Sequence, residues 1–325
     1  MDIRPYSRRQ LKHLEAGTAL WSARSSLLAN EAELSGGMHW KPVRDRQYLV
    51  RYWTDGTTGA KRSKSLGVRS ETTEKLYADF ADARARSAKL SETLNPKLSE
   101  WSSAAASLDL ARLSPATTSL YREFQRSGHG DVLLVDRDAW LAHSVFLGSE
   151  LVGVRAMDPF DLGGNAVVVM VPDHVDREAV SAAILRSHRG LEQSKQVFVG
   201  NDGTTVFAMM LQASHLVGWA MDNSGEQKGR ALMHCLAGSP ARAVLPDADG
   251  LPMSVSTMQP AASVLMAWIS QDLPHARRPD VVRDYAIGMA EALVEREDPL
   301  IEAVIDAVPD LALELQAGGR DGFRI

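Results

Sequence analysis

Several features that would define a class of protein are rare or missing in this chain of 325 residues. It has one cysteine, Cys235, which excludes an internal disulfide framework and any metal site built from several cysteines. No apolar run approaches the roughly 18 residues of a membrane helix, and the start MDIRPYSRRQLKHLE does not resemble a signal peptide. These absences predict a cytoplasmic protein with no membrane partner.

The motifs of several enzyme classes are also missing. None of the nine histidines stands four residues from another, so the sequence lacks a helical metal pair. There is no Gly-x-Ser-x-Gly elbow, and the glycine turns LGGN and GNDGTT have no Walker lysine. Cys235 lies in the apolar helical pattern ALMHCLAG, which favours a buried structural thiol over a nucleophile.

The overall composition is that of an ordinary globular protein. Hydrophobic residues make up 45% and charged residues 24% of the chain, and its length predicts two or three structural modules. The net charge of -5 gives no whole-chain attraction to nucleic acid or to an anionic membrane. A binding surface for a polyanion would therefore have to be local.

The first third of the sequence predicts two long helices that bracket a β-hairpin. Leucines recur at helical spacing over 7–34, and Gly36-Gly37 ends the pattern. QYLVRYW alternates as a strand does, TDGTTG is a turn, and KRSKSLG returns. A second helix over 70–94 opens with Ser-x-x-Thr/Glu, which resembles an N-cap.

The rest of the sequence predicts a mixed α/β region followed by helices. Strand candidates are DVLLV, AVVVMVP, KQVFVG, TTVFAMML, RAVL and MSVSTM, with the helices SPATTSLYREFQRSG and DREAVSAAILRSH among them. Three later helices each begin with proline, in PAASVLMAWIS, PDVVRDYAIGMAEALVE and PLIEAVIDAV. We expect an α+β fold with an N-terminal module at 1–128, an α/β domain at 129–258 and a helical region at 259–325.

Two stretches carry a family resemblance. GGMHWKPVRDRQYLVR and KSLGVRSETTEKLYADF resemble the N-terminal module of a bacterial family of nucleotidyltransferase-like domain proteins. The matching residues are Trp40, Lys41, Tyr48, Leu49, Arg51, Lys64, Ser65, Leu66, Gly67, Arg69 and Ser70. A weaker similarity runs along nearly the whole chain, through VLLVDRDAWLAHS, VGNDGTTVFAMML and DADGLPMSVSTMQPAASVLMAWISQ. It implies a nucleotidyltransferase-like mixed β-sheet with flanking helices.

The resemblance implies a reaction that moves an NMP unit from an NTP to an acceptor with the help of Mg²⁺. Such a site needs two carboxylates at i and i+2 on one strand, which point to the same face. A third carboxylate comes from a neighbouring strand. A Gly-Ser or Gly-Thr turn at a helix N-terminus then binds the triphosphate.

This sequence departs from those requirements at four places. The expected phosphate turn reads Asp136-Arg137-Asp138, and a Met, Met266, stands near the position of the family's lysine. The acidic pair, Asp158 and Asp161, is spaced i, i+3 around Pro159, which on a strand sends the two side chains to opposite faces. DPFDLGGN is also typical of a turn. TTVFAMML holds no acid, so that Phe207 or a neighbour replaces the third ligand.

We therefore expect a nucleotidyltransferase-like fold whose metal site has degenerated. If the site is active, Asp158 and Asp161 are its catalytic and Mg²⁺-binding residues. Arg137 and Arg155 would then contact the phosphates of the NTP.

The hairpin region is rich in basic and aromatic residues. Eight Lys or Arg residues lie between Lys41 and Arg69, against Asp45 and Asp55, and Trp40, Tyr48, Tyr52 and Trp53 are interleaved with them. This pattern favours contact with a nucleic acid, either tRNA or DNA. The candidate binding residues are Lys41, Arg51, Trp53, Arg62 and Lys64. In the alternative interpretation, the aromatic residues pack on the two helices and the basic residues are simply solvated.

Three functions are consistent with the sequence. The first is a nucleotidyltransferase-fold pseudoenzyme that acts as a binding or regulatory module on nucleic acid or a protein partner. The second is an active Mg²⁺-dependent nucleotidyltransferase acting on an RNA, a protein or a small molecule. The third is an interaction protein that oligomerises through its long helices.

Overall fold

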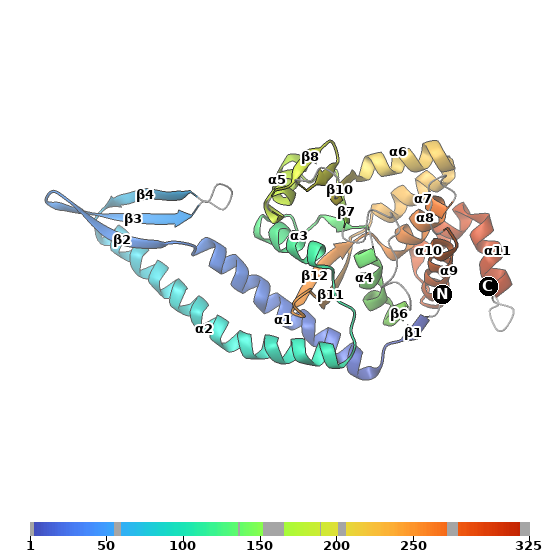
Figure 1. Ribbon diagram of the computed structural model, residues 1–325, viewed down its shortest axis with the longest axis horizontal. Coiled ribbons are helices and arrows are strands. Elements are labelled where there is room, and N and C mark those ends of the chain that lie inside the picture. Colours follow the sequence, from blue (N-terminus) through green and yellow to red (C-terminus); the bar gives the residue numbers. More distant parts are fainter. Residues whose placement is uncertain are drawn as a thin grey trace. The chain divides into compact units, whose positions relative to one another are not determined.

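The computed structural model describes residues 3–54, 60–135, 137–151, 166–188, 190–200, 206–271 and 279–318. The chain forms two compact units, one from Ala19–Trp101 and the other from Met1–Thr18 together with Ser102–Ile325. Helices and a mixed β-sheet make the fold α+β, as the sequence predicts (Figure 1). The division into three modules stays a prediction.

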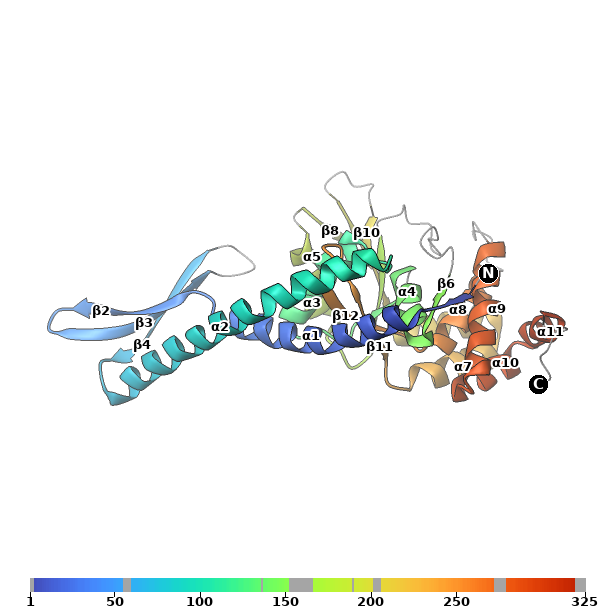
Figure 2. The ribbon, with the colours of Figure 1, turned by 90° about the horizontal axis from the view of Figure 1, so that it is seen from below.

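In the first unit, two long helices flank an antiparallel sheet, as expected. The helices are α1 (Arg8–Glu33) and α2 (Glu71–Ser107), and Figure 2 shows the first half of α2 beside the sheet, with α1 beyond the end of the sheet. The sheet has the order β2-β3-β4, with β2 at Gly37–Val43, β3 at Arg46–Thr54 and β4 at Lys61–Val68. The sequence pattern predicted a hairpin of β3 and β4 but not the strand β2. Pro42 weakens the strand signal of β2, but an edge strand tolerates proline.

The helix α2 extends further than predicted. It continues past Leu94 and through Pro96, a residue that cannot donate a backbone hydrogen bond. Leu94, Leu98 and Trp101 are nevertheless buried at helical spacing on one side. Tertiary packing of this apolar stripe therefore outweighs the local cost of the proline.

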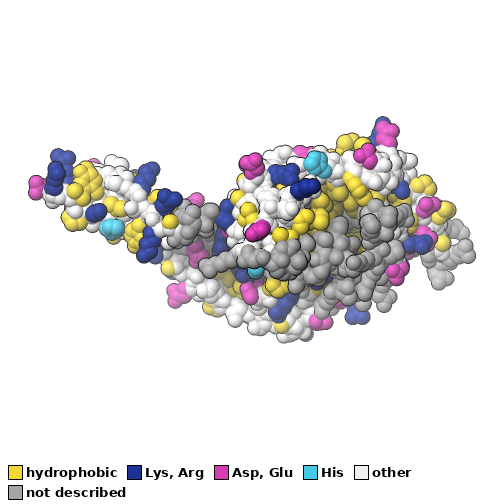
Figure 3. All heavy atoms as spheres, turned by 45° about the horizontal axis from the view of Figure 1, so that its top comes forward, with side chains coloured by type: hydrophobic (Ala, Val, Ile, Leu, Met, Phe, Trp, Pro, Cys, Tyr) yellow, Lys and Arg dark blue, Asp and Glu magenta, His cyan; other side chains and the backbone are white. Residues whose placement is uncertain are grey.

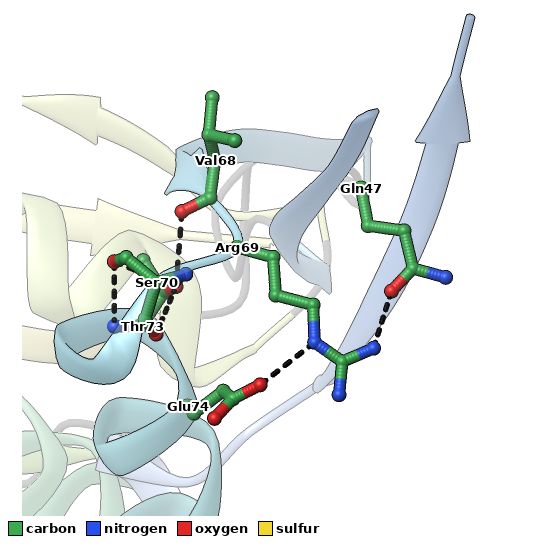
Figure 4. Close-up of polar contacts among 6 residues, drawn as sticks. All are labelled: Gln47, Val68, Arg69, Ser70, Thr73 and Glu74. Carbon is green, nitrogen blue, oxygen red and sulfur yellow. Dashed lines mark hydrogen bonds and ion pairs between the residues drawn. The ribbon is translucent and has the colours of Figure 1, made fainter. Parts of the chain in front are cut away.

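The predicted N-cap of α2 is confirmed by its hydrogen bonds (Figure 4). The Ser70 amide donates to Thr73 Oγ1 at 2.9 Å, and the Thr73 amide lies 3.4 Å from Ser70 Oγ. Thr73 Oγ1 is also 3.0 Å from the Val68 carbonyl oxygen. This reciprocal arrangement satisfies amide groups that a helix start leaves without intrahelical partners.

Within the described residues of the second unit, seven strands form one mixed sheet with the order β11-β12-β5-β7-β10-β9-β8. The strands are β5 (Leu133–Leu134), β7 (Val167–Val171), β8 (Glu192–Ser194), β9 (Val197–Val199), β10 (Val206–Gln212), β11 (Ala241–Pro246) and β12 (Pro252–Thr257). β7 is parallel to β10 and antiparallel to β5, and β5 is parallel to β12. A separate small sheet pairs β1 (Ile3–Pro5) with β6 (Ser149–Leu151). All six predicted strands are present, whereas β1, β6 and the fully exposed β8 were not predicted.

Helices surround this sheet. They are α3 (Pro115–Arg126), α4 (Arg137–Leu147), α5 (Arg177–Ser187), α6 (Ala213–Ser224), α7 (Glu226–Leu236), α8 (Pro260–Gln271), α9 (Pro279–Glu295), α10 (Pro299–Ala307) and α11 (Pro309–Gly318). The three helices predicted from a leading proline, α8 to α10, are confirmed. None of the helices that the structure describes is long and apolar enough to cross a membrane.

A buried polar cluster connects α4 to β12 and α9. His143 is fully buried, with Nδ1 3.2 Å from Tyr285 Oη and Nε2 3.1 Å from Thr257 Oγ1. The ring of Trp140 stacks on Tyr285 with centroids 3.7 Å apart. Burial lowers the pKa of His143 to about 4, and it raises the pKa of Tyr285 well above its ordinary value. The hydrogen bonds of His143 place it in the core as a structural residue.

Candidate functional site

The resemblance implies a carboxylate in TTVFAMML, which includes β10, one of the three central strands of the large sheet. All five residues of β7, the sequence VVVMV, are at most 1% exposed to solvent. Val169 lies opposite Leu134 of β5 and Met210 of β10. The described strands β5, β7 and β10 contain no Asp or Glu. They therefore offer no carboxylate to a divalent cation.

The predicted catalytic pair, Asp158 and Asp161, lies outside the described residues, as does Arg155. Among the residues that the structure does describe, no group of three His, Cys, Asp or Glu side chains is close enough together to hold a metal ion. Phe207, expected to replace the third acid, lies in β10 and stacks on His188 with ring centroids 5.0 Å apart. Met266 is buried in α8.

Arg137, the predicted phosphate contact, begins α4 and has an acidic partner. Its Nη2 donates to Asp138 Oδ1 at 2.9 Å, and Asp138 is only 2% exposed. The other oxygen of Asp138 accepts the Ser114 amide at 2.9 Å, which connects α4 to the start of α3. A carboxylate thus lies in the first turn of α4, where it competes with any anionic ligand of the helix N-terminus.

A cleft of about 660 Å³ lies between one face of the large sheet and the helices α6 and α7. Its described lining is mostly apolar and includes Leu133, Met170, Val217, Met233, Leu236 and Met258, but no Lys or Arg. Asp173 at its edge accepts hydrogen bonds from the amide and the hydroxyl of Ser214. This lining suits an apolar group better than a triphosphate.

Cys235, beside the same cleft, is fully buried, which confirms its predicted structural character. Burial raises the pKa of its thiol to about 12, and the negative charge of Asp298 acts in the same direction. The thiol is therefore protonated at neutral pH and is a poor nucleophile.

The three-stranded sheet has two different faces, because side chains alternate along each strand. We call the face toward α2 the inner face. It contains the fully buried Leu49, and the ring of Trp40 on this face lies 6.0 Å from Tyr77 of α2. The guanidinium of Arg51 lies 6.0 Å over the ring of Phe80, and its Nη2 donates to the carbonyl of Glu33. Trp40 therefore packs on a helix as the packing alternative expects, whereas Arg51 also contacts the helices although that alternative expects it to be solvated.

Arg69 holds the sheet to the start of α2 (Figure 4). Its guanidinium donates to Gln47 Oε1 at 2.5 Å and forms an ion pair with Glu74 Oε1 at 2.8 Å. It also lies 5.2 Å over the ring of Trp40. We therefore assign to Arg69 a role in joining strand and helix.

The opposite face, which we call the open face, presents a different set of side chains. Its residues are His39, Lys41, Val43, Arg46, Tyr48, Val50, Tyr52, Thr54, Lys61, Ser63, Ser65 and Val68, as the strand register places them. Tyr52 is 46% exposed, and its ring lies 5.5 Å from that of His39. Exposed aromatic rings are unusual on a sheet and mark this face as a candidate interface.

The structure separates the five predicted nucleic-acid contacts. Arg51, Trp53, Arg62 and Lys64 share the inner face, and only Lys41 belongs to the open face. Arg62 and Lys64 are exposed on β4, whereas Arg51 contacts the helices. Tyr48 and Tyr52 are visible in the sequence pattern, but the two-residue alternation is needed to assign them to a face. Lys61 and His39 were not among the predicted contacts.

The charge of this sheet differs from that of the whole chain. The three described strands contain no Asp or Glu, whereas their Lys and Arg residues are Lys41, Arg46, Arg51, Lys61, Arg62 and Lys64. In Figure 3, dark-blue basic side chains recur around hydrophobic ones at the left of the view. A net charge of -5 for the chain makes this positive surface a local feature.

Comparison with known proteins gives no match to a family model, to a curated protein or to a solved structure. No family is therefore assigned, and the nucleotidyltransferase-like resemblance stays a prediction.

Proposed function

We propose that this chain is a nucleotidyltransferase-like protein that has lost metal-dependent transfer and works as a nucleic-acid-binding module. The observation that supports the first half is the absence of Asp and Glu from β10, where the resemblance implies a third metal ligand, and from its neighbours β5 and β7. The motifs around Trp40 and Lys64 add the family resemblance. The basic three-stranded sheet supports the second half.

The chemistry of nucleotidyl transfer explains why the central strands matter. Two Mg²⁺ ions and a triphosphate need oxygen ligands and positive side chains in place of their hydration shells. Val167, Val169 and Met170 provide neither, and transferring an ion to such a surface carries a large desolvation cost. The acidic partner of Arg137 also reduces the positive charge available to phosphates.

A transfer assay tests the loss of catalysis. The full-length protein is incubated with each labelled NTP, total RNA or protein acceptors, and Mg²⁺ or Mn²⁺. We expect no labelled product and no metal-dependent rise of the melting temperature with any NTP. The matched variant is Asp158→Ala with Asp161→Ala. Label incorporation by wild type that the double variant loses would establish an active enzyme that uses Asp158 and Asp161, with Arg137 and Arg155 as its predicted phosphate contacts.

A binding assay tests the second half. Filter retention of labelled RNA and DNA by the full-length protein is measured from low to high salt. We expect retention that falls steeply with salt, because lysines and arginines displace counterions from the phosphates. No retention of either polymer, together with a tight dimer in light scattering, would favour the third function, an interaction protein assembled through its helices.

A further inference from the structure

The open face has a regular layout that the strand register defines. Tyr48 in β3 lies between Lys41 of β2 and Val68 of β4, and two residues further Val50 lies between His39 and Ser65. Tyr52 lies between Gly37 and Ser63, and Lys61 lies opposite Thr54 at the far end. The two tyrosines are thus about 13 Å apart along one strand, at about 3.3 Å per residue.

Tyr52 lies across the neighbouring strand, over a glycine that leaves room for it. A Cβ atom at Gly37 would stand 2.3 Å from Tyr52 Oη and 2.5 Å from its Cζ. On the same strand, the His39 ring is tilted by 51° against that of Tyr52. The absence of a side chain at Gly37 therefore lets the tyrosine ring cover β2 while almost half of it stays exposed.

From this geometry we infer that the open face is a stacking platform for single-stranded nucleic acid. The inference rests on the proposed function and names the surface and the form of the ligand. Unpaired bases stack on exposed Tyr and His rings with little regard to sequence, whereas the bases of a duplex stay covered by their neighbours. Lys41 and Lys61, at opposite ends of the tyrosine row, can each contact a backbone phosphate.

The charges of the face favour nucleic acid over other partners. It combines two exposed lysines and the exposed Arg46 with two serine hydroxyls, and none of its strands contains a carboxylate. A membrane-inserting face would expose large aliphatic side chains, but here Val43 and Val68 are the exposed aliphatic ones in the described strands. The face carries stacking rings and phosphate-binding cations together, which is the combination that single strands require.

Fluorescence anisotropy with the full-length protein tests the platform. The probes are a labelled 12-nucleotide mixed-sequence RNA, the DNA of the same sequence, and the corresponding duplexes. We expect the single strands to bind at least tenfold more tightly than the duplexes. Tyr52→Ala and Tyr48→Ala should each weaken single-strand binding about tenfold, since removing one stacking ring removes most of one base contact. Tyr52→Phe keeps the ring and should change binding less than twofold.

Two charge-matched double variants show which face of the sheet binds the nucleic acid. Lys41→Ser with Lys61→Ser removes two of the three positive charges of the open face, and Arg62→Ser with Lys64→Ser removes the same charge from the inner face of β4. We expect the first pair of substitutions to weaken single-strand binding at least five times more than the second pair does. Circular dichroism and melting curves confirm that each variant is folded, and an unfolded variant is replaced by its glutamine version.

The possible contrary results are distinct. If the protein binds nucleic acid but loses it only with Arg62→Ser and Lys64→Ser, the platform is wrong and the proposed function stands. Equal binding of duplex and single strand, or displacement by polyglutamate as effective as by unlabelled RNA, also overturns the platform. If no nucleic acid binds at all, the proposed function itself fails. A difference in affinity between the RNA and DNA probes identifies which polymer the platform binds.

Discussion

The central strands of the large sheet and the strands of the three-stranded sheet share one property and differ in another. Neither set contains an acidic residue. In β7 all five side chains are buried, whereas Tyr52, Lys41 and Lys61 are exposed on the open face. Missing acids therefore have two consequences. In the core they remove ligands for metals, and at the surface they leave the three strands with a local excess of positive charge.

The largest effect is expected from putting an acid back into the central strand. Val169→Asp introduces a carboxylate at a fully buried position between Leu134 and Met210. Because these two apolar neighbours cannot pair with a carboxylate, we expect the free energy of unfolding to fall by more than about 3 kcal/mol. Urea denaturation measures the change.

The matched control for this prediction is Val68→Asp on the open face, where the side chain is 36% exposed. It should change the free energy of unfolding by less than about 1 kcal/mol. A stable Val169→Asp protein that also gains Mg²⁺-dependent stabilisation would mean that the central strands still form a site able to accept a metal.

The next effect is the pH dependence of the buried His143. Its pKa is lowered to about 4 in the folded protein, so at pH values between about 4 and 6.5 the unfolded chain binds a proton that the folded protein does not. The free energy of unfolding should therefore fall by up to about 3 kcal/mol as the pH falls through this window. Above pH 6.5 the contribution of His143 to the free energy of unfolding is fully present.

Urea titrations at several pH values between 7 and 4 measure this slope for wild type and for His143→Gln. Glutamine keeps hydrogen-bonding groups near Tyr285 and Thr257 but does not titrate. The variant should lose stability at neutral pH and show a flatter slope. An unchanged slope would show that another group causes the acid sensitivity.

Two adjacent glycines sharpen the description of the open face. Gly36 has a φ of +81°, and an added Cβ would lie 1.8 Å from the Tyr52 carbonyl oxygen, which is backbone. Gly36→Ala should therefore destabilise the protein by more than about 2 kcal/mol. At Gly37 the added Cβ meets only the end of the Tyr52 side chain, which can rotate away, so the cost should be below about 1 kcal/mol.

Thermal melting compares the two alanine variants, and oligonucleotide anisotropy measures the consequence at Gly37. Gly37→Ala should weaken single-strand binding by moving the Tyr52 ring although the tyrosine is still present. If Gly37→Ala displaces the Tyr52 ring and the affinity for single strands is unchanged, Tyr52 is not part of the platform.

The smallest effects are expected at the junction of β4 and α2. Thr73→Val removes the hydroxyl that accepts the Ser70 amide, and should cost about 1 kcal/mol. Glu74→Gln breaks the ion pair with Arg69, whose two side chains are 52% and 53% exposed, and should cost less than about 0.5 kcal/mol. Chemical denaturation of both variants ranks them, and the reverse order would show that the ion pair is the main contact at this junction.

Local signals in the sequence were sufficient to predict most elements of the fold. Proline starts α8, α9 and α10, and consecutive β-branched residues form β7. Signals that depend on partners were missed. β2 is a strand because it pairs with β3, and α2 passes Pro96 because Leu98 and Trp101 are buried beyond it.

The candidate site was predicted less completely than the fold. The absence of acids from TTVFAMML is visible in the sequence, and the same holds for the basic and aromatic content of 40–69. The packing alternative applies to the inner face of that region, and the nucleic-acid alternative stays a prediction. Arg51 and Trp40 pack against α2, while Tyr52 and Lys41 do not. Asp158 and Asp161 stay predictions.

The sequence by itself determined most helices, α6 and α11 excepted, most strands and the lack of carboxylates in the central strands, since these follow from residue type and short-range spacing. Only the tertiary structure decided which side of the three-stranded sheet is covered and which is exposed. The reason is physical: alternation assigns residues to two faces, but burial depends on which face meets the apolar side chains of α2, a contact between residues distant in sequence.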